Sequence, residues 1–318
     1  MGSPLRVGIV GAGHFGRFHI QKSLLHPLEM LIGFSEIDKE RAFSIAEEFS
    51  ICFFENLGEL LQEVEAVVIA TPAITHFKLA KLALESGKHV FLEKPLAVKN
   101  EEGLALLRLA EEKKRILKVG HLLTYSLPVQ KILEIIPSPS IIEVERCVPY
   151  ANRGEDVSIA FDLMIHDLEL LASLFGEIGV CLEARGRKIK TDLWDEIFSR
   201  FFFRSKCQVS LFASRAVEEG KRKISIEDAQ FSLEADFVRQ ELRYFRKRNV
   251  GEKIFLHQIE WPKIDLLWQE HDDFTRLCLE GEFYTKGYNA ETAFQALCMA
   301  ERIEEKILDE SVKERLIR

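Results

Sequence analysis

The sequence predicts an α/β fold in two parts: an N-terminal domain built on a parallel sheet, and a C-terminal α+β domain with a large, mostly antiparallel, open sheet. Three observations predict this class. Between residues 5 and 120, short apolar runs alternate with amphipathic helical segments, which is typical of a parallel sheet covered on both faces. A glycine-rich turn joins the first run to the first helix. From residue 178 to residue 260, strand-like segments follow one another without a helix.

The elements of the first domain can be read in order from the apolar runs and the residues between them. Strands are predicted at 5–10, 30–36, 65–70, 88–95 and 116–120. Helices are predicted after the glycine-rich turn, after Asp38 as an N-cap, from Thr71-Pro72, and after Asn100 as a further N-cap. After Gly120 the alternation breaks, a helix is predicted over residues 157–175, and helices resume at Asp265.

The length of 318 residues is too great for one typical core and suits two domains. We place a nucleotide-binding domain at 1–120 and a domain for substrate binding and oligomerisation at 121–318, whose terminal helices can pack back on the first domain. Several strands of the second domain alternate polar and apolar residues, so one face of its sheet should be solvated or meet a partner. Many of the 23 phenylalanines fall there. An ordinary core accounts for most of them, but the face also suits a homodimer or homotetramer.

Composition excludes several classes of protein. The net charge is -8 and the pI is near 5.7, which argues against nucleic-acid binding. Six cysteines are widely spaced without a C-x-x-C pair, so we expect buried free thiols and no metal site. No apolar stretch is long enough to span a bilayer, and a strand begins too early for a signal peptide. We therefore expect a cytoplasmic enzyme or binding protein without membrane partners.

The segment "GAGHFG" carries the spacing G-x-G-x-x-G at Gly11, Gly13 and Gly16, with His14 and Phe15 inside it. The first glycine permits a tight turn, the second lets the backbone approach a pyrophosphate, and the third lets the helix pack close on the strand. The motif follows a predicted strand and opens a predicted helix, which is the context that a dinucleotide site requires. The first domain is therefore predicted to be a Rossmann domain.

Glu36 ends the second predicted strand, where an acid accepts hydrogen bonds from the adenosine ribose hydroxyls. Because a carboxylate repels a 2′-phosphate, NAD is favoured over NADP. The alternative is an ordinary solvated glutamate at a strand end.

Two further segments follow strands at the edge of the sheet where such folds bind ligands. "TPAITH" supplies Thr71, Pro72 and His76, and "EKP" supplies Glu93 and Lys94. We expect these residues to line the cofactor site, with Lys94 lying over the cofactor and reaching the substrate. A solvated, charged strand end is the plainer alternative for Glu93 and Lys94.

Asp162 and His166 lie four residues apart in a predicted apolar helix, so they share one face of it. A buried histidine oriented by a carboxylate is one interpretation. The other is a base with its orienting acid, which is favoured by the presence of Lys94 in the other domain. Oxidation of a secondary alcohol needs such a base, a donor to the hydroxyl oxygen, and a nicotinamide that accepts the hydride.

Four segments in order, "VGIVGAGHFGRFH", "ATPAITH", "LEKPLA" and "FDLMIHDLELL", resemble the motifs of the Gfo/Idh/MocA oxidoreductases. The resemblance implies NAD(P) in the Rossmann domain, a sugar or cyclitol substrate, and subunits that associate through the outer face of the second sheet. It implies Lys94 as the catalytic lysine, and His166 as the base in a D-x-x-x-H motif that begins at Asp162. This chain departs from the family pattern at Ala73, where asparagine is common, and at Met164, where glycine is common.

The segments "DLMIHDLEL" and "VGHLLTYSLPV" are similar in sequence to the matching segments of family members that act on UDP-N-acetylglucosamine-type sugars and oxidise the 3-hydroxyl. His121 matches that group, whereas Tyr125 keeps only the outline of its motif. Arg153 is a candidate to bind a diphosphate, and a plain surface arginine is an equal alternative. The alternatives left open are an inositol or free-sugar dehydrogenase, a non-catalytic NAD-binding regulator, and an NAD-dependent glycosidase.

Overall fold

The computed structural model describes residues 3–136, 138–151, 155–249, 252–261, 264–281 and 289–317. The chain forms two compact units. The first comprises Met1–Leu122 and Asp265–Phe294, and the second comprises Leu123–Ile264 and Gln295–Arg318. Each unit is therefore assembled from two separate stretches of sequence.

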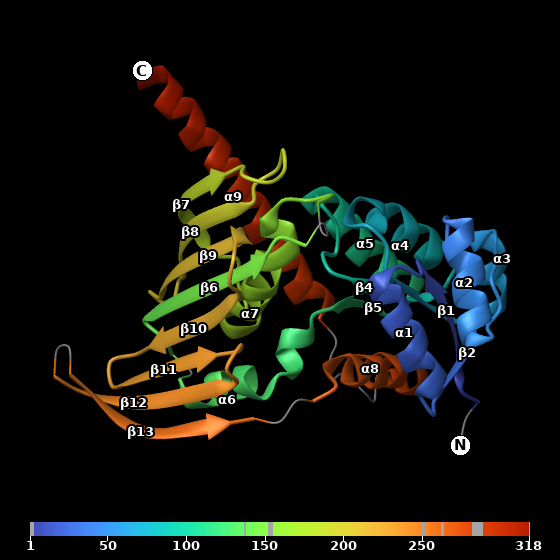
Figure 1. Cartoon of the computed structure of the whole chain (residues 1–318), viewed down its shortest axis with the longest axis horizontal. Coiled ribbons are helices and arrows are strands. Elements are labelled where there is room, and N and C mark those ends of the chain that lie inside the picture. Colours follow the sequence, from blue (N-terminus) through green and yellow to red (C-terminus); the bar gives the residue numbers. More distant parts are fainter. Residues whose placement is uncertain are drawn as a thin grey trace. The chain divides into compact units, whose positions relative to one another are not determined.

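The first unit is built on a parallel five-stranded sheet (Figure 1). Its strands, in spatial order, are β2(Glu29–Ser35), β1(Leu5–Val10), β3(Ala66–Ile69), β4(His89–Glu93) and β5(Leu117–Gly120). All four neighbouring pairs are parallel, and the central strand β3 is buried along its whole length because both faces of the sheet are covered. This confirms the predicted sheet and brings the carboxyl ends of the strands to one edge.

Helices cover both faces of this sheet. They are α1(His14–Leu25), α2(Lys39–Phe49), α3(Leu57–Glu63), η1(Ala73–Thr75), α4(His76–Glu85), α5(Asn100–Lys113) and α8(Leu266–Glu280). The helix α4 packs beside α5, and α8 packs beside α1 and β1 (Figure 1). The last helix of the unit thus comes from a stretch of sequence more than a hundred residues beyond the rest, which places buried side chains of α8 against α1 and β2.

Three predicted helix starts can be compared with the structure. Asp38 is the N-cap of α2, and its side chain accepts a hydrogen bond from the Arg41 N–H at 3.1 Å, as predicted. Asn100 is instead the first residue of α5, with Lys99 at the N-cap. Pro72 precedes a short 3₁₀ turn that leads into α4, so Thr71 lies outside the helix that it was expected to cap.

The second unit is built on an eight-stranded sheet. In spatial order its strands are β13(Glu252–Glu260), β12(Glu241–Asn249), β11(Phe231–Asp236), β10(Lys221–Glu227), β6(Ile141–Pro149), β9(Gln208–Val217), β8(Glu196–Phe202) and β7(Val180–Arg187). Every neighbouring pair is antiparallel except β6 and β9, which confirms a large, mostly antiparallel, open sheet.

The two faces of this sheet differ in character. The inner face carries buried apolar side chains such as Val144 and Leu211, and it packs against a helix formed by η3(Ala160–Met164) and α7(Ile165–Phe175). The outer face carries charged and aromatic side chains. It holds a hollow of about 410 Å³ whose lining includes Glu143, Lys223 and Phe212. Alternation along each strand therefore separates a core face from a face with no helix on it within the described residues.

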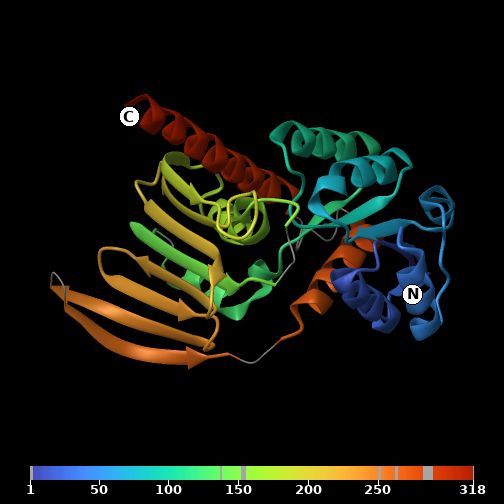
Figure 2. The ribbon, with the colours of Figure 1, turned by 45° about the horizontal axis from the view of Figure 1, so that its top comes forward.

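Three further helical segments have most of their residues in the second unit. They are η2(Leu122–Tyr125), α6(Leu127–Ile135) and the long α9(Ala290–Ile317). From Gln295 onward α9 belongs to the second unit, where Figure 2 shows it as a red helix beside the yellow-green strands. The Arg302 guanidinium donates to the Gly179 carbonyl at 3.1 Å, and Ser158 donates a hydrogen bond to Glu304. Within the described residues, every helix is too short or too polar to cross a lipid bilayer.

Candidate active site

The glycine-rich turn packs against backbone atoms at Gly11 and Gly16, whereas the space beside Gly13 is open. Gly11 has φ +88°, and a Cβ there would lie 2.6 Å from the Ala70 carbonyl oxygen. A Cβ on Gly16 would lie 2.0 Å from the Gly11 carbonyl oxygen. Nothing lies within 4 Å of the Cβ position of Gly13. The turn therefore leaves room for a ligand over Gly13, at the N-terminus of α1, and it fits the pyrophosphate of a dinucleotide.

His14 and Phe15 begin α1 beside this turn. Phe15 is 47% exposed, and the His14 ring meets the rings of Phe15 and Phe18 edge-on at centroid distances of 5.6 and 4.9 Å. The two predicted cofactor contacts thus lie next to the open side of the turn, as part of a small aromatic cluster at the surface.

Glu36 lies against the glycine-rich turn. Its Oε2 accepts from the Ala12 N–H at 2.8 Å, and its Oε1 accepts from the Asp38 N–H at 3.0 Å. The Arg41 guanidinium lies 3.3 Å from Oε2. Since each carboxylate oxygen can accept more than one hydrogen bond, Glu36 keeps capacity for further donors. The Glu36 carboxylate is therefore held against the glycine-rich turn, directly after β2.

His76 connects the loops that follow β3 and β4. Its Nδ1 lies 2.7 Å from the Pro95 carbonyl oxygen, and its Nε2 lies 2.9 Å from the Thr71 carbonyl oxygen. A neutral imidazole carries a single ring proton, so both contacts are hydrogen bonds only when His76 is an imidazolium. The Thr71 hydroxyl also meets the Thr75 hydroxyl at 2.7 Å. Residues from T-P-A-I-T-H and E-K-P are therefore held together at one edge of the sheet.

Glu93 and Lys94 end β4 at this edge. The Glu93 carboxylate lies 2.8 Å from His19 Nε2 of α1. Burial alone would raise the pKa of Glu93, but the hydrogen bond with His19 and the charges of Lys94 and His76 outweigh it, so the pKa is lowered. Glu93 is therefore a half-buried carboxylate held by His19, and Lys94, the next residue, is half-buried as well.

His121 follows β5 and is 1% exposed. Burial lowers its pKa to about 3, and the charges of Lys94 and Lys118 add to that effect, while Glu93 opposes it. His121 thus stays neutral at pH 7 in the electrostatic field of Glu93 and Lys94.

In the second unit, Asp162 and His166 lie on either side of a change in helix type. Asp162 belongs to the π-helical segment Ala160–Met164, and His166 belongs to the α-helix that continues from Ile165. Both side chains are half-buried, whereas the sequence suggested full burial. A π-helical turn inserted in an α-helix is frequent at functional sites because it changes the direction of the side chains around it.

A buried ion pair fixes the residue after His166. Arg146 of β6 holds Asp167 through two hydrogen bonds, Nε to Oδ2 at 2.6 Å and Nη2 to Oδ1 at 2.5 Å. The two residues are 6% and 1% exposed. Arg222 stands opposite Arg146 in the strand register, and burial together with the Arg146 charge lowers its pKa to about 9. The pair anchors α7 to the inner face of the sheet.

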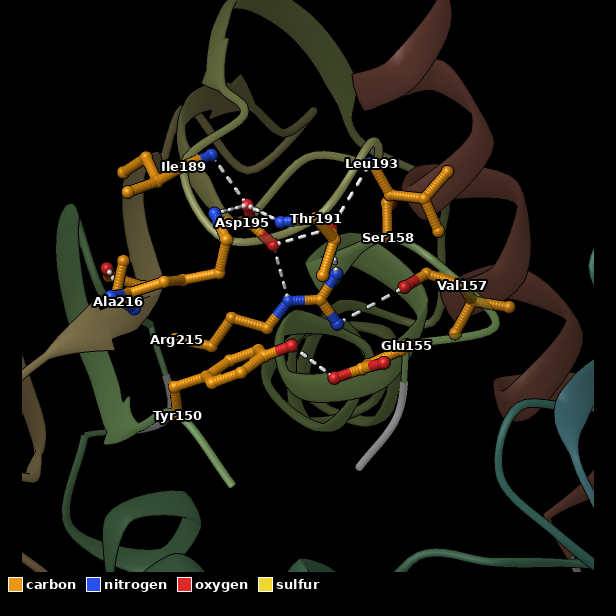
Figure 3. A network of polar contacts seen from close by, with 12 residues as sticks. Tyr150, Glu155, Val157, Ser158, Ile189, Thr191, Leu193, Asp195, Arg215 and Ala216 are labelled. Carbon is orange, nitrogen blue, oxygen red and sulfur yellow. Dashed lines mark hydrogen bonds and ion pairs between the residues drawn. The ribbon is translucent and has the colours of Figure 1, made fainter. Parts of the chain in front are cut away.

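A second network fixes the entry to the same helix (Figure 3). Asp195 accepts from the Ile189, Lys190 and Thr191 N–H groups at 2.6, 2.6 and 2.9 Å. Arg215 donates to Asp195 at 2.8 Å and to the Val157 carbonyl at 3.3 Å. The charged carboxylate therefore links the loop before β8 to the segment that leads into Asp162.

The predicted site residues thus form two groups, one in each unit. In the first unit, the glycines and Glu36 meet at the turn, and Thr71, His76, Glu93 and Lys94 meet at the same edge of the sheet. In the second unit, Asp162 and His166 share one helix, and Tyr125 is buried at the end of η2. Arg153 lies outside the described residues. Over the described residues, His, Cys, Asp and Glu side chains nowhere form a group of three or more that could hold a metal ion.

Sequence reasoning missed the residues that support this site. Arg146, Asp167 and Asp195 act through partners distant in the sequence, so no local pattern marks them. His19 carried a signal: it stands three residues after the last glycine of the motif, on the buried face of α1. No pattern in the sequence marked its partner His271, because α8 contacts α1 only in the folded chain.

Known proteins resemble this chain in sequence. Residues 5–121 match the family model of the Gfo/Idh/MocA oxidoreductases, described as an oxidoreductase family with an NAD-binding Rossmann fold. UDP-N-acetylglucosamine 3-dehydrogenase of Acidithiobacillus ferrooxidans is 34% identical over 244 residues, which cover 76% of this chain and 77% of that protein. Inositol 2-dehydrogenase of Serratia proteamaculans is 26% identical over 187 residues, or 54% of this chain and 55% of that protein.

Solved structures are similar over both units. A structure of the Acidithiobacillus ferrooxidans UDP-N-acetylglucosamine 3-dehydrogenase superposes with a TM-score of 0.86 at 30% identity, covering 96% of this chain and 98% of that one. GenD2 from gentamicin A biosynthesis, solved in complex with NAD, has the same fold, with a TM-score of 0.83 at 19% identity and coverage of 98% and 96%. On the motifs, the fold and this similarity, the chain belongs to the Gfo/Idh/MocA family and is an NAD(P)-dependent oxidoreductase that acts on CH–OH groups.

Proposed function

We propose that the protein is an NAD-dependent dehydrogenase that oxidises the 3-hydroxyl of a UDP-N-acetylhexosamine. The observation that carries this proposal is the 34% identity with UDP-N-acetylglucosamine 3-dehydrogenase, which extends over 76% of the chain and therefore beyond the Rossmann domain. In a two-domain dehydrogenase the second domain supplies the residues that select the substrate, so similarity there bears on the substrate class.

In the proposed reaction, Lys94 and His166 act on one hydroxyl group. The Lys94 ammonium donates a hydrogen bond to the hydroxyl oxygen and stabilises its developing negative charge. His166 removes the proton, and Asp162 orients the imidazole and stabilises its protonated form. A positioned base of this kind contributes about 10²–10⁴-fold to the rate. The bound nicotinamide supplies the hydride acceptor.

The residues of the first unit suit the remaining contacts of the cofactor. The backbone around Gly11, Gly13 and Gly16 would hold the pyrophosphate, with His14 and Phe15 beside it. Glu36 would accept from the adenosine ribose hydroxyls, which favours NAD over NADP because the carboxylate repels a 2′-phosphate. Thr71, Pro72, His76 and Glu93 would border the nicotinamide half.

Substrate contacts in the proposal include Tyr125 and Arg153, with Arg153 as the cation for a diphosphate. A free sugar or inositol is the second candidate substrate class, favoured by the similarity to inositol 2-dehydrogenase. The outer face of the second sheet, with its hollow of about 410 Å³, is the surface through which we expect two or four copies of the chain to associate.

The test is a substrate panel with the purified protein. We expect NADH absorbance to appear with NAD and UDP-N-acetylglucosamine, and kcat/KM to be at least tenfold lower with N-acetylglucosamine or myo-inositol. Faster oxidation of myo-inositol would assign the second candidate. Cofactor binding without turnover on any substrate would favour a regulator, and release of reducing sugar without net NADH would favour a glycosidase.

A further inference from the structure

Arg222 is a half-buried cation on the inner face of the second sheet. It stands in β10, between β6 and β11 (Figure 1), directly opposite Arg146 in the strand register. Residues opposite each other on neighbouring strands project from the same face, so Arg222 shares the face that carries Arg146 and the buried Val144. The helix with Asp162 and His166 packs against this same face.

The two neighbouring arginines differ in what balances their charge. Asp167 holds Arg146 through two hydrogen bonds and so neutralises it. Within the described part of the chain, the Arg222 guanidinium forms no ion pair, and its Nε is fully buried without a hydrogen-bond acceptor. The group formed by Arg146, Asp167 and Arg222 therefore keeps one uncompensated positive charge.

The surroundings make the charge of Arg222 costly to keep buried. Burial and the charge of Arg146 both lower the pKa of Arg222, and the Asp167 carboxylate opposes them only in part. A guanidinium that has already lost much of its water needs little further desolvation when an anion binds to it. Its hydrogen bonds to that anion are also stronger than they would be in water. The position is therefore prepared for an anionic ligand.

Two aromatic rings lie on the other side of Arg222. Its guanidinium lies over the Phe237 ring, 4.6 Å from the ring centroid, and the Trp261 ring meets Phe237 edge-on at 6.0 Å. The Phe237 N–H donates to the Arg222 carbonyl at 2.8 Å, which holds the two residues side by side. Both rings are half-buried. A cation beside such rings suits a nucleoside diphosphate, since the cation binds phosphate oxygens and a ring offers a surface for the base.

We propose that Arg222 binds the diphosphate of the nucleotide-sugar substrate, with Phe237 and Trp261 beside it for the base. This assignment rests on the proposed function and adds a second cation to Arg153, because each of the two phosphates carries a negative charge. The planar guanidinium donates to two phosphate oxygens at once. The subsite lies on the face of the sheet that packs against the helix of the proposed base, His166.

Arg222→Met separates a role in binding from a role in folding, because it removes the charge and keeps an apolar stem. Loss of a residue that only supports the fold would lower the melting temperature. Loss of an uncompensated, half-buried charge should leave the melting temperature of the ligand-free protein equal or higher. Lys221→Met is the matched control. It removes the same charge from the next position of β10, on the opposite face, where Lys221 pairs with Glu145.

Calorimetric titration with UDP in the absence of cofactor measures the subsite directly. We expect Arg222→Met to raise the Kd for UDP at least tenfold, and Lys221→Met to bind UDP as the wild type does. Arg222→Lys, which keeps the charge but loses the planar fork, should show a smaller loss and carries the test if the methionine variant does not fold. Equal UDP affinity in the wild type and the Arg222 variants, or a wild type that does not bind UDP, would overturn the assignment. An equal loss of affinity for NAD would assign the cation to the cofactor and overturn it as well.

Turnover measurements keep the subsite separate from the proposed reaction. With UDP-N-acetylglucosamine and NAD, Arg222→Met should raise KM at least tenfold and change kcat little, because the diphosphate lies away from the reacting hydroxyl. Turnover with an unchanged KM would reject the subsite and leave the proposed function in place. UDP binding that depends on Arg222, without turnover on any alcohol, would support the subsite and reject only the proposed reaction.

Discussion

Lys94 is the residue on which the proposed chemistry depends most directly. It follows Glu93 at the carboxyl edge of the sheet, where parallel sheets of this type bind ligands. We expect Lys94→Ala to lower kcat by about 10²-fold or more, since it removes a donor that acts on the developing charge. The Kd for NAD, measured by titration, should change little. The exposed Lys99, on the same loop, is the control, and unchanged kcat in Lys94→Ala would remove the lysine from the mechanism.

Glu36 decides which cofactor the first unit accepts in our proposal. Its carboxylate is fixed against the glycine turn by the Ala12 N–H, with Arg41 next to it. Glu36→Ala should weaken NAD binding at least tenfold and should weaken NADP binding much less, because it removes both an acceptor and a repulsive charge while Arg41 stays. Fluorescence titration with each cofactor measures the two affinities. Glu40→Ala, in the first turn of α2, is the control, and an equal loss for both cofactors would contradict the role of Glu36.

At the scale of elements, the helix that carries Asp162 and His166 is fixed at both of its ends. Asp195 and Arg215 hold the segment before it (Figure 3). Arg146 holds Asp167 within its first α-helical turn. The π-helical segment lies between these anchors. A helix held at two points by charged groups can keep an irregular turn, because straightening it would break one of the buried ion pairs.

The Arg146–Asp167 pair should therefore contribute strongly to stability. Arg146→Met leaves the Asp167 carboxylate buried without its partner, which we expect to cost about 3–5 kcal/mol of unfolding free energy. Urea unfolding followed by circular dichroism measures the loss. Lys221→Ala, which removes the partner of Glu145 in an exposed ion pair on neighbouring strands, should cost about 1 kcal/mol or less. Adding Asp167→Leu to Arg146→Met should recover part of the loss, and no recovery would argue against an uncompensated charge.

At the scale of the whole molecule, the free energy of unfolding should depend on pH because the pKa of Glu29 is lowered in the folded protein. Its folded pKa is lowered from 4.5 to about 2, so its contribution is present above pH 4.5 and disappears as the pH falls toward 2. We expect the wild type to be more stable than Glu29→Gln at pH 7 and the difference to shrink between pH 4.5 and 2. Melting temperatures of both proteins across this range test the sign. A difference that is constant with pH would show that Glu29 contributes packing rather than charge.

Association of subunits is the second property at this scale. Phe212 lies on the outer face of the second sheet, within the lining of its hollow, next to charged neighbours such as Glu145. We expect Phe212→Arg to shift the protein from dimer or tetramer to monomer in light scattering, because it places an unmatched charge in the interface. Phe43→Arg, at a side chain 62% exposed on α2, is the control. A monomeric wild type, or an unchanged mass for Phe212→Arg, would reject this interface.

The sequence by itself determined the features that depend on residues close together in the chain. Apolar runs separated by helices predicted the parallel sheet, the G-x-G-x-x-G spacing predicted the turn at Gly11, and Asp38 predicted a helix start, all of which the structure confirms. These features follow from neighbours a few residues apart, so a short stretch of sequence contains the physical cause. The same local reasoning marked the residues of the proposed site, from Glu36 to His166.

Only the tertiary structure decided which distant groups meet. The pairing of His19 with His271 joins residues 252 positions apart, and that of Arg146 with Asp167 joins a strand to a helix. The π-helical turn at Asp162 was equally out of reach, because a regular helix fits the same apolar spacing. Burial makes these contacts strong by removing water, and burial is a property of the packed chain, which no local pattern of residues expresses.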